Sequence, residues 1–154
     1  MTVQAAQQAL FLSAKDFDAE RISLFGALDE KQLNELCAYL HVEQHKAGDT
    51  IFSQGEPPSS IYVLLDGRVD CVFDSEELHT LQASLSYGDV FGESAFIGIQ
   101  PQSGTAKVTA AATLLVLDRD ALMALHDKDL ELFALLIMNM ARELGRKYQQ
   151  SLLE

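Results

Sequence analysis

The sequence predicts a mainly β fold, a sandwich or jelly roll, with helical segments before it and one long helix after it. Between residues 42 and 117, short apolar–polar alternations are separated by turns rich in Gly, Asp and Pro, as in antiparallel sheets. On either side of this region, apolar residues recur at helical spacing instead. The 154 residues, 48% of them apolar, fit one domain with a sizeable core.

The first clear helix follows a capping signal. Upstream of it, the segment up to Phe25 is weakly patterned, and we expect a helix or a helical turn there. Asp29 is a good N-cap, and Gln32, three residues later, completes a capping box. One helical face then carries Leu33, Leu36, Cys37 and Leu40. On this face we expect Cys37 to be a core residue without redox chemistry.

Eight segments of the middle region are predicted to be strands. They cover residues 42–46, 50–52, 60–65, 68–73, 78–85, 90–91, 105–110 and 113–117. Asp66-Gly67 stands between two alternating runs, which is a strong hairpin signal, so we predict a tight turn there. Val69, Cys71 and Phe73 alternate with polar neighbours and are expected to point inward.

The C-terminal region predicts two helices, a short one capped by Asp118 and a longer one capped by Asp127. We expect the inward stripe of the longer helix to comprise Leu130, Phe133, Ile137, Ala141, Leu144 and Tyr148. Much of its remaining surface is also apolar, through Leu132, Leu135, Leu136 and Met138. A helix of this kind is covered on both sides, either by its own domain or by a second subunit. We favour the second alternative and predict a homodimer along residues 128–148.

The composition narrows the possible functions. A formal net charge of −12 and a pI of about 4.6 argue against nucleic-acid binding, which needs clustered Lys and Arg. No apolar run reaches the roughly 18–20 residues that span a bilayer, and the first residues lack the basic region of a signal peptide. The two cysteines do not suggest a disulfide framework. We therefore expect a cytoplasmic protein that contacts neither membrane nor nucleic acid.

Patterns for catalysis and metal binding are absent from the sequence. His41 and His45 are four residues apart, which on a strand separates them by about 13 Å, too far to share a metal ion. His79 and His126 are isolated. No Ser or Cys has a credible His partner for nucleophilic catalysis, and two cysteines on different elements cannot hold an iron–sulfur cluster. We expect neither an enzyme nor a cofactor.

The most informative segment is GDVFGESAFI, residues 88–97. Two glycines and an acid stand there between a strand-like run and a short helix-like run. Such a turn exposes backbone N–H groups at a helix start, where unpaired donors and the helix dipole stabilise an anion. A Glu at this place, Glu93, can accept hydrogen bonds from sugar hydroxyls. A phosphate site and a ribose acceptor together indicate a nucleotide pocket.

These motifs resemble the cyclic nucleotide-binding domain, the sensor module of catabolite activator-like regulators, cyclic-nucleotide-gated channels and kinase regulatory subunits. The resemblance covers roughly residues 24–148. It depends on the order of AGDTIF (47–52), QGE (54–56), IYVLLDGRV (61–69) and GDVFGE (88–93). It implies an eight-stranded antiparallel jelly roll with N-terminal helices and a long C-terminal helix. The expected organisation is a helical extension over 1–23, the β-roll over 24–126 and the C-terminal helix over 127–154, within the same domain.

The resemblance also assigns ligand-binding residues. Gly92 is expected to let the backbone approach the ligand, and Glu93 to accept from the ribose 2′-hydroxyl. The amides of Ser94 and Ala95 would face the cyclic phosphate. Tyr148, on the stripe expected to face inward, is a further candidate to cover the base.

One expected part of the pocket is missing. The family places an Arg on the phosphate, followed by Thr or Ser and then Ala, whereas this chain has Gly104-Thr105-Ala106. Lys107 is the nearest base, but it alternates with Ala106 and should point to solvent. A charged hydrogen bond contributes about 1.5–3 kcal/mol against roughly 1 for a neutral one. If neutral hydrogen bonds replace part of the contribution of the missing Arg, binding is therefore weakened by about 5- to 30-fold.

Two hypotheses follow from this pattern. In the first, the chain is a stand-alone sensor of cAMP or cGMP that signals through its C-terminal helix to an unidentified protein partner. In the second, it is a sensor-shaped module for interaction and dimerisation that no longer binds nucleotide. Glu93 and Thr105 favour the first hypothesis and Gly104 the second. A transcription regulator would continue into a helix-turn-helix, whereas this sequence ends at Glu154, so we expect no direct DNA binding.

Overall fold

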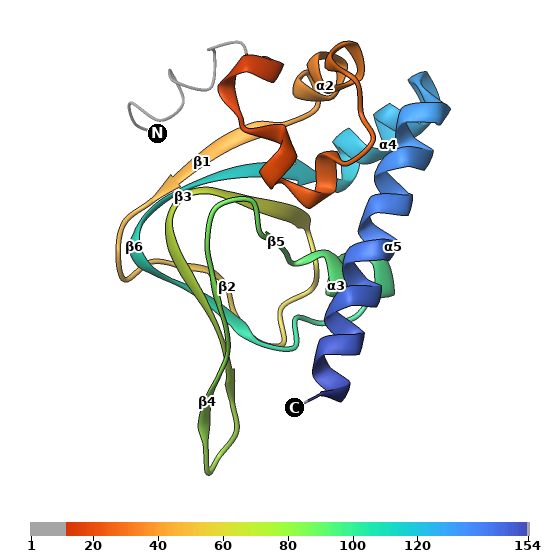
Figure 1. The fold of residues 1–154 in the computed structure, drawn as a ribbon. Coiled ribbons are helices and arrows are strands. Elements are labelled where there is room, and N and C mark those ends of the chain that lie inside the picture. The colour runs from red at the N-terminus through yellow and green to blue at the C-terminus, as the bar shows by residue number, and fades with distance from the viewer. Residues whose placement is uncertain (1–11, 154) are drawn as a thin grey trace.

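The computed structural model describes residues 12–153 (Figure 1). Within this range the strands are β1 (His41–His45), β2 (Thr50–Phe52), β3 (Ser60–Asp74), β4 (His79–Leu85), β5 (Val90–Phe91) and β6 (Thr105–Asp118). The α-helices are α2 (Glu30–Cys37), α3 (Glu93–Gly98), α4 (Arg119–Lys128) and α5 (Leu130–Leu152). Three 3-10 helices precede α2, namely η1 (Ala14–Asp16), η2 (Ala19–Arg21) and η3 (Ser23–Phe25). Residues 1–11 of the predicted N-terminal extension lie outside the described residues.

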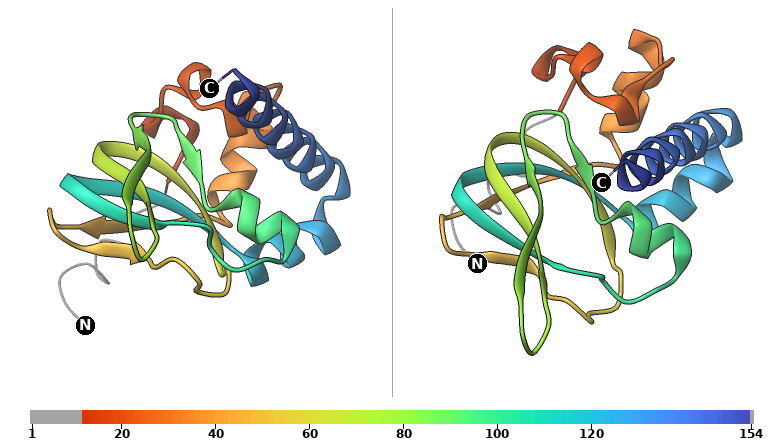
Figure 2. Two further views of the ribbon diagram at one scale, coloured as in Figure 1. Left: turned by 90° about the horizontal axis from the view of Figure 1, so that it is seen from below. Right: turned by 60° about the horizontal axis from the view of Figure 1, so that its bottom comes forward.

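The strands form one antiparallel sheet that curls into a roll. Its order is β1-β6-β3-β4, with β2 also paired to β6 and β5 to β3. The 3-10 helices, α2, α4 and α5 lie to one side of the roll, and the β3–β4 hairpin projects from it (Figures 1 and 2). This arrangement confirms the predicted jelly roll with flanking helices and a long C-terminal helix. No helix among residues 12–153 has both the length and the apolar character needed to cross a membrane.

Two pairs of predicted strands run together into the long strands β3 and β6. The predicted tight turn at Asp66-Gly67 is wrong, because β3 continues through it. The pairing of β3 with β6 shifts register between Leu64 and Val69, and Gly67 has a φ of +84°. A Cβ atom on Gly67 would lie 2.1 Å from the carbonyl oxygen of Ala111. The glycine thus serves a bulge and a close approach between two strands.

A second irregularity changes which residues of β3 face inward. The pairing of β3 with β4 shifts register between Cys71 and Val72. Val69 and Val72 are buried and Cys71 is half-buried, whereas Phe73 is 39% exposed. The prediction was therefore right for Val69 and wrong for Phe73, because a bulge interrupts the two-residue alternation on which it depended.

The buried apolar residues form two clusters. The interior of the roll contains Phe52, Tyr62, Leu64, Val69, Leu85, Phe91, Ala106, Val108, Ala112, Leu114 and Val116. The second cluster, which we call the helix-side core, lies between the outer face of the roll and the helices. Its larger members are Phe17, Ile22, Leu24, Phe25, Leu33, Leu36, Ile61, Phe96, Leu115, Leu117, Leu122, Leu125, Leu132, Leu136 and Met140. α5 contributes three residues to this core, so its first half is packed into the domain.

The predicted helix caps are largely confirmed. The Gln32 amide donates to Asp29 at 2.7 Å, and the Asp29 amide donates back to the Gln32 side chain at 3.0 Å. Asp118 caps α4 by accepting from the Ala121 amide at 2.8 Å. The cap of α5 is Asp129 rather than Asp127, because the Asp129 carboxylate accepts from the Leu132 amide. Cys37 of α2 is buried in the helix-side core, as expected.

The buried face of α5 differs from the predicted inward stripe, of which Phe133 and Ile137 are half-buried against the helix-side core. The side chains buried against the domain are Leu132, Leu136, Asn139 and Met140. Leu130 and Tyr148, which were expected to point inward, are 61% and 65% exposed. The inward face also carries the polar residues Asn139 and Lys147, whose partners lie far away in the sequence. The apolar pattern alone therefore selected the wrong face.

Candidate functional site

The site is built on the turn between β5 and α3. β5 pairs with β3 through Tyr62↔Phe91 and Val63↔Val90, and this pairing fixes where the turn begins. Gly92 then adopts a left-handed conformation with a φ of +79° and forms the N-cap of α3. A Cβ atom at Gly92 would lie 3.1 Å from the Tyr62 ring and 3.2 Å from the Ser60 carbonyl oxygen. Both the backbone conformation and the available space therefore favour glycine here.

The first turn of α3 presents backbone amides and one carboxylate. Gly92 has no side chain that could cap the helix. The first amides of a helix, here those of Ser94 and Ala95, also lack the preceding turn whose carbonyl oxygens would accept their hydrogen bonds. Glu93, in the same turn, is only 1% exposed. A buried charge is costly unless it is paired. The chain therefore supplies a partner from another element.

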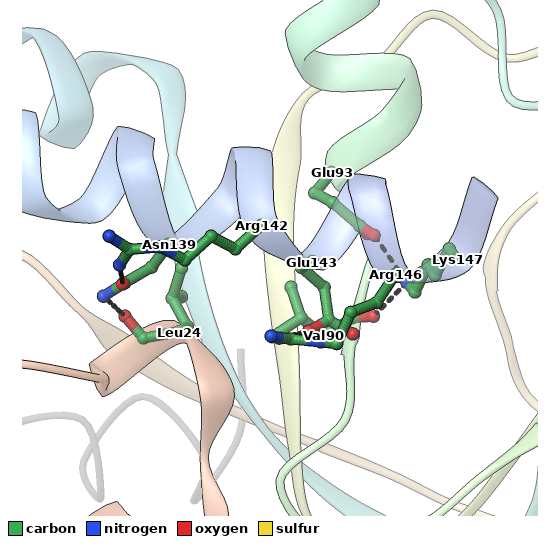
Figure 3. A network of polar contacts seen from close by, with 8 residues as sticks. All are labelled: Leu24, Val90, Glu93, Asn139, Arg142, Glu143, Arg146 and Lys147. Atoms are coloured by element: carbon green, nitrogen blue, oxygen red, sulfur yellow. Dashed lines mark hydrogen bonds and ion pairs between the residues drawn. The ribbon is translucent and has the colours of Figure 1, made fainter. Parts of the chain in front are cut away.

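That partner is Lys147, near the end of α5. Its Nζ donates to the Glu93 carboxylate at 2.5 Å and to the Val90 carbonyl oxygen at 2.7 Å (Figure 3). The Lys147 side chain is 41% exposed, so its stem reaches inward from the edge of the domain. We did not identify Lys147 from the sequence. The signal was its spacing of seven and eleven residues from Met140 and Leu136, which places it on the inward face of α5.

Earlier in α5, Asn139 holds the helix to the N-terminal segment. Its Nδ2 donates to the carbonyl oxygen of Leu24 at 2.9 Å (Figure 3). It also donates to the carbonyl oxygen of Gly26 at 2.7 Å. Arg142 in turn donates to the Asn139 side-chain oxygen at 3.1 Å. This buried network lies two helical turns before Lys147. α5 is therefore attached at two separate points, and the second of them is at the predicted ligand site.

The second predicted segment, Gly104-Thr105-Ala106, begins β6. Thr105 and Ala106 are buried, and the Thr105 hydroxyl accepts from the Gln54 amide at 2.9 Å. Gly104 does not have a positive φ. A Cβ atom there would nevertheless lie 2.9 Å from the Val72 carbonyl oxygen and 2.8 Å from the Gln82 side chain. An Arg at this position would therefore require the Gln82 side chain to move and the β3 backbone at Val72 to shift.

A shared neighbour relates the two segments. Cys71 is the cross-strand partner of Ala106. Burial raises the pKa of the Cys71 thiol to about 11, and the smaller influences on it include Lys147, which lowers it, and Glu93, which raises it. Phe52 of β2 is also a Cα partner of Ala106, and its ring centroid lies 6.1 Å from that of Phe91, the residue before Gly92. The fold brings the two predicted segments into the same part of the roll.

The exposure of Lys107 and Tyr148 shows which way these two side chains point. Lys107 is exposed, as expected from its alternation with Ala106. Tyr148 is 65% exposed, so the prediction that it lies on the inward stripe is wrong, whereas its contact with a base stays a prediction. In its place, the residue that α5 directs at the site is Lys147. In β1, His41 and His45 each contact Glu43 at 3.1 Å.

Comparison with known proteins agrees with this geometry. The family described as the cyclic nucleotide-binding domain matches residues 42–129, more than half of the chain. A cGMP-dependent protein kinase of Plasmodium berghei is 31% identical over 111 residues, which cover 67% of this chain and 12% of the kinase. The chain thus belongs to the cyclic nucleotide-binding domain family, and it spans only a small part of that kinase.

Solved structures show the same fold. A cyclic nucleotide-binding domain from Methylobacillus flagellatus superimposes with a TM-score of 0.80 at 21% identity, covering 92% of this chain and 84% of that one. The regulatory subunit of a cAMP-independent protein kinase A from Trypanosoma brucei, as a triple mutant bound to cAMP in its A site, superimposes with a TM-score of 0.71. It is 21% identical, and the match covers 88% of this chain and 49% of that one.

Proposed function

We propose that this protein is a cytoplasmic regulatory sensor of cAMP or cGMP, and not an enzyme. The ligand site centres on Gly92, Glu93, Ser94, Ala95, Thr105 and Ala106. The observation that carries the proposal is the buried Glu93 carboxylate behind the left-handed Gly92. Lys147 compensates the charge of this carboxylate, and a carboxylate has further acceptor positions that suit a ribose hydroxyl. Ligand binding at this site would act on α5, which contacts Glu93 directly and passes the change to a protein partner.

The absence of an Arg at Gly104 leads us to propose weak binding, in the micromolar range or weaker. The phosphate would be held by the first amides of α3 and by hydroxyl groups such as that of Thr105. Such neutral bonds contribute about 1 kcal/mol each, and charged bonds up to about 3. The short distances at Gly104 mean that replacement by Arg would first cost stability. The Gly104→Arg variant therefore tests affinity only if its melting temperature is preserved.

Calorimetric titration with cAMP and cGMP tests the proposal. We expect saturable binding of at least one of them, weakened by about 1–3 kcal/mol in Glu93→Ala, because the acceptor for a buried hydroxyl is lost. Glu77→Ala, which removes an exposed carboxylate from the β3–β4 hairpin, is the matched control and should bind as the natural protein does. Unchanged affinity in Glu93→Ala would mean that the ligand binds elsewhere.

The alternative function is a domain for protein interaction that no longer binds nucleotide. The specific observation in its favour is the narrow space at Gly104, where Val72 and Gln82 lie close to the position of the missing side chain. A cAMP-independent kinase regulatory subunit has the same fold, so the fold is compatible with this alternative. Absence of binding of both cyclic nucleotides at millimolar concentration would favour it.

We also propose a homodimer through α5, on a different face from the one first expected. Leu132 and Leu136 are buried in the domain and cannot contact a partner. The outward stripe has the alternating spacing of four and three residues found in two-stranded coiled coils. It consists of Leu130, Ala134, Ile137, Ala141, Leu144 and Tyr148. Ile137 is half-buried against the helix-side core, Leu144 is half-buried, and the others are exposed.

The oligomeric state is measured by size exclusion with light scattering. We expect a dimer at tens of micromolar, and a monomer for Ala141→Glu, because this substitution puts a charge in the middle of the exposed stripe. Gln149→Glu adds the same charge beside the stripe and should leave the dimer intact. A natural protein that stays monomeric with and without cyclic nucleotide would refute the dimer.

A further inference from the structure

The pairing of Glu93 with Lys147 has a consequence for any anionic ligand. Glu93 is almost fully buried, and its carboxylate accepts from Lys147 at 2.5 Å. Without that ammonium group, the first turn of α3 would hold an uncompensated negative charge. A cyclic phosphate brought to the same turn adds a second one. Two like charges at close range in a poorly solvated site repel each other strongly.

Three arginines on or near α3 and α5 have partners other than Glu93. Arg146 pairs with Glu143 on the surface of α5, and Arg142 donates to Asn139. Arg119 lies over the Phe96 ring, with its guanidinium carbon 4.4 Å from the ring centroid. Lys147 is the cation that the fold holds against Glu93. Its Nζ is fixed by two acceptors, and one of them, the Val90 carbonyl oxygen, belongs to the strand that leads into the site.

We propose that Lys147 is a positioning residue of the ligand site and supplies the counter-charge that the start of β6 lacks. This inference rests on the proposed function and names the cation for that same site. The ammonium group neutralises the charge of the Glu93 carboxylate. The pocket then carries no net negative charge when the cyclic phosphate arrives. The family has an Arg at the position of Gly104, whereas Gly104 carries no charge. The positive charge comes instead from Lys147 of α5, a distant part of the chain.

The arrangement makes α5 part of the binding site. Lys147 reaches Glu93 only while the last turns of α5 lie against α3 and β5, as they do in Figure 3. Binding of an anionic ligand therefore favours the docked position of these turns. By linkage, detaching them weakens binding by the same factor. The ligand is thus coupled to the helix that bears the outward apolar stripe.

The test compares charged and uncharged ligands on matched variants. Lys147→Met removes the charge and keeps an apolar stem, Lys147→Arg keeps the charge, and Arg146→Met removes a charge from the preceding residue. Affinities for cAMP and cGMP are measured by calorimetry, and those for adenosine and guanosine by chemical-shift titration. We expect Lys147→Met to weaken binding of the cyclic nucleotide by about 10- to 100-fold, the range of a charged hydrogen bond. The nucleosides should change by less than about threefold, since they carry no phosphate, and Lys147→Arg and Arg146→Met should bind nearly normally.

Three outcomes would overturn the inference. Unchanged cyclic nucleotide affinity in Lys147→Met would refute it and leave the proposed function intact. An equal loss for nucleosides and cyclic nucleotides would show that Lys147 has only a structural role. Absence of cyclic nucleotide binding by the natural protein would refute both the inference and the proposed function.

A double variant covers the case in which Lys147→Met alone is poorly folded. Glu93→Gln with Lys147→Met removes both charges, so no carboxylate is buried without a partner. Its pocket is again neutral, and we expect it to bind the cyclic nucleotide more tightly than Lys147→Met does. A double variant that binds no better would contradict the role of Lys147 as a counter-charge.

Discussion

The two halves of α5 are held to the domain by different forces. In the first half, Leu132, Leu136 and Met140 are buried in the helix-side core, and Asn139 is buried with them. Among the described residues 143–152, no side chain is buried to this extent. There the contacts are polar, from Lys147 to Glu93 and Val90 and from Glu143 to Ser23. One half is thus fixed by apolar burial and the other by polar bonds, including those to the proposed ligand site.

The difference indicates where the domain can respond to a ligand. Burial of a Leu side chain stabilises the folded state by about 1.5–3 kcal/mol, whereas the attraction within an ion pair with a buried partner is largely offset by the cost of removing that partner from water. The last turns of α5 should therefore detach at a much lower free energy than the first half. A ligand that alters the surroundings of Glu93 acts on the half that is able to move.

The largest expected effect is on the free energy of unfolding, when one Leu side chain in each half of α5 is truncated to Ala. Leu136→Ala should lower the free energy of unfolding by about 2–5 kcal/mol, because it removes a fully buried side chain and leaves a cavity. Leu144→Ala, at a half-buried position, should cost less than about 1.5 kcal/mol. Urea denaturation of both variants measures the difference. Equal losses would show that the two halves are packed alike.

The next effect concerns Asn139, the buried polar residue in the first half of α5. Asn139→Ala removes the donor to the Leu24 and Gly26 carbonyl oxygens and should cost about 1–3 kcal/mol, because buried acceptors lose their partner. Arg142→Ala, which removes an exposed donor to the same side chain, should cost less than about 1 kcal/mol. Denaturation of both variants tests this order, and a larger loss in Arg142→Ala would contradict it.

The smallest effect is a pH dependence confined to the second half. Burial opposes the charge of Glu143, but hydrogen bonds from Arg146 and Ser23 prevail and lower its pKa below the ordinary value of 4.5. A carboxyl group with a lowered pKa stabilises the fold above its unfolded pKa and loses this contribution as the pH falls through its folded pKa. Glu143→Gln should therefore cost about 1 kcal/mol or less at pH 7 and progressively less below the ordinary pKa.

Denaturation of the natural protein and of Glu143→Gln at neutral and at acidic pH gives this difference. Leu136→Ala serves as the comparison, because it changes no titrating group and its cost should vary little over the same range. A cost of Glu143→Gln that grows as the pH falls would contradict the assigned sign.

The sequence predicted the roll well, because alternation and turn residues are local signals. It failed at Asp66-Gly67, since a glycine with positive φ suits a hairpin and a bulge equally, and the approach of Ala111 decides between them. It could identify the missing Arg at Gly104. It could not show that Val72 and Gln82 narrow the space there, because these residues are distant in the sequence.

The faces of α5 were mistaken for a related reason. Polar residues are expected to face solvent, yet Asn139 and Lys147 point inward, where the carbonyl oxygens of Leu24 and Gly26 and the Glu93 carboxylate are their partners. Those partners lie more than fifty residues away. The sequence signal for Glu93 came from a local turn motif, whereas Lys147 belongs to no motif. Its role became visible only when tertiary structure brought the two side chains together.

Amide hydrogen exchange with and without cyclic nucleotide tests the central claim, that the ligand binds at Glu93 and acts on the second half of α5. At saturating cAMP or cGMP we expect slower exchange in residues 93–98 and 143–152. Exchange in residues 132–140 should stay the same, because apolar burial holds this segment in either state. Protection confined to other parts of the roll, or a uniform change along α5, would contradict the account.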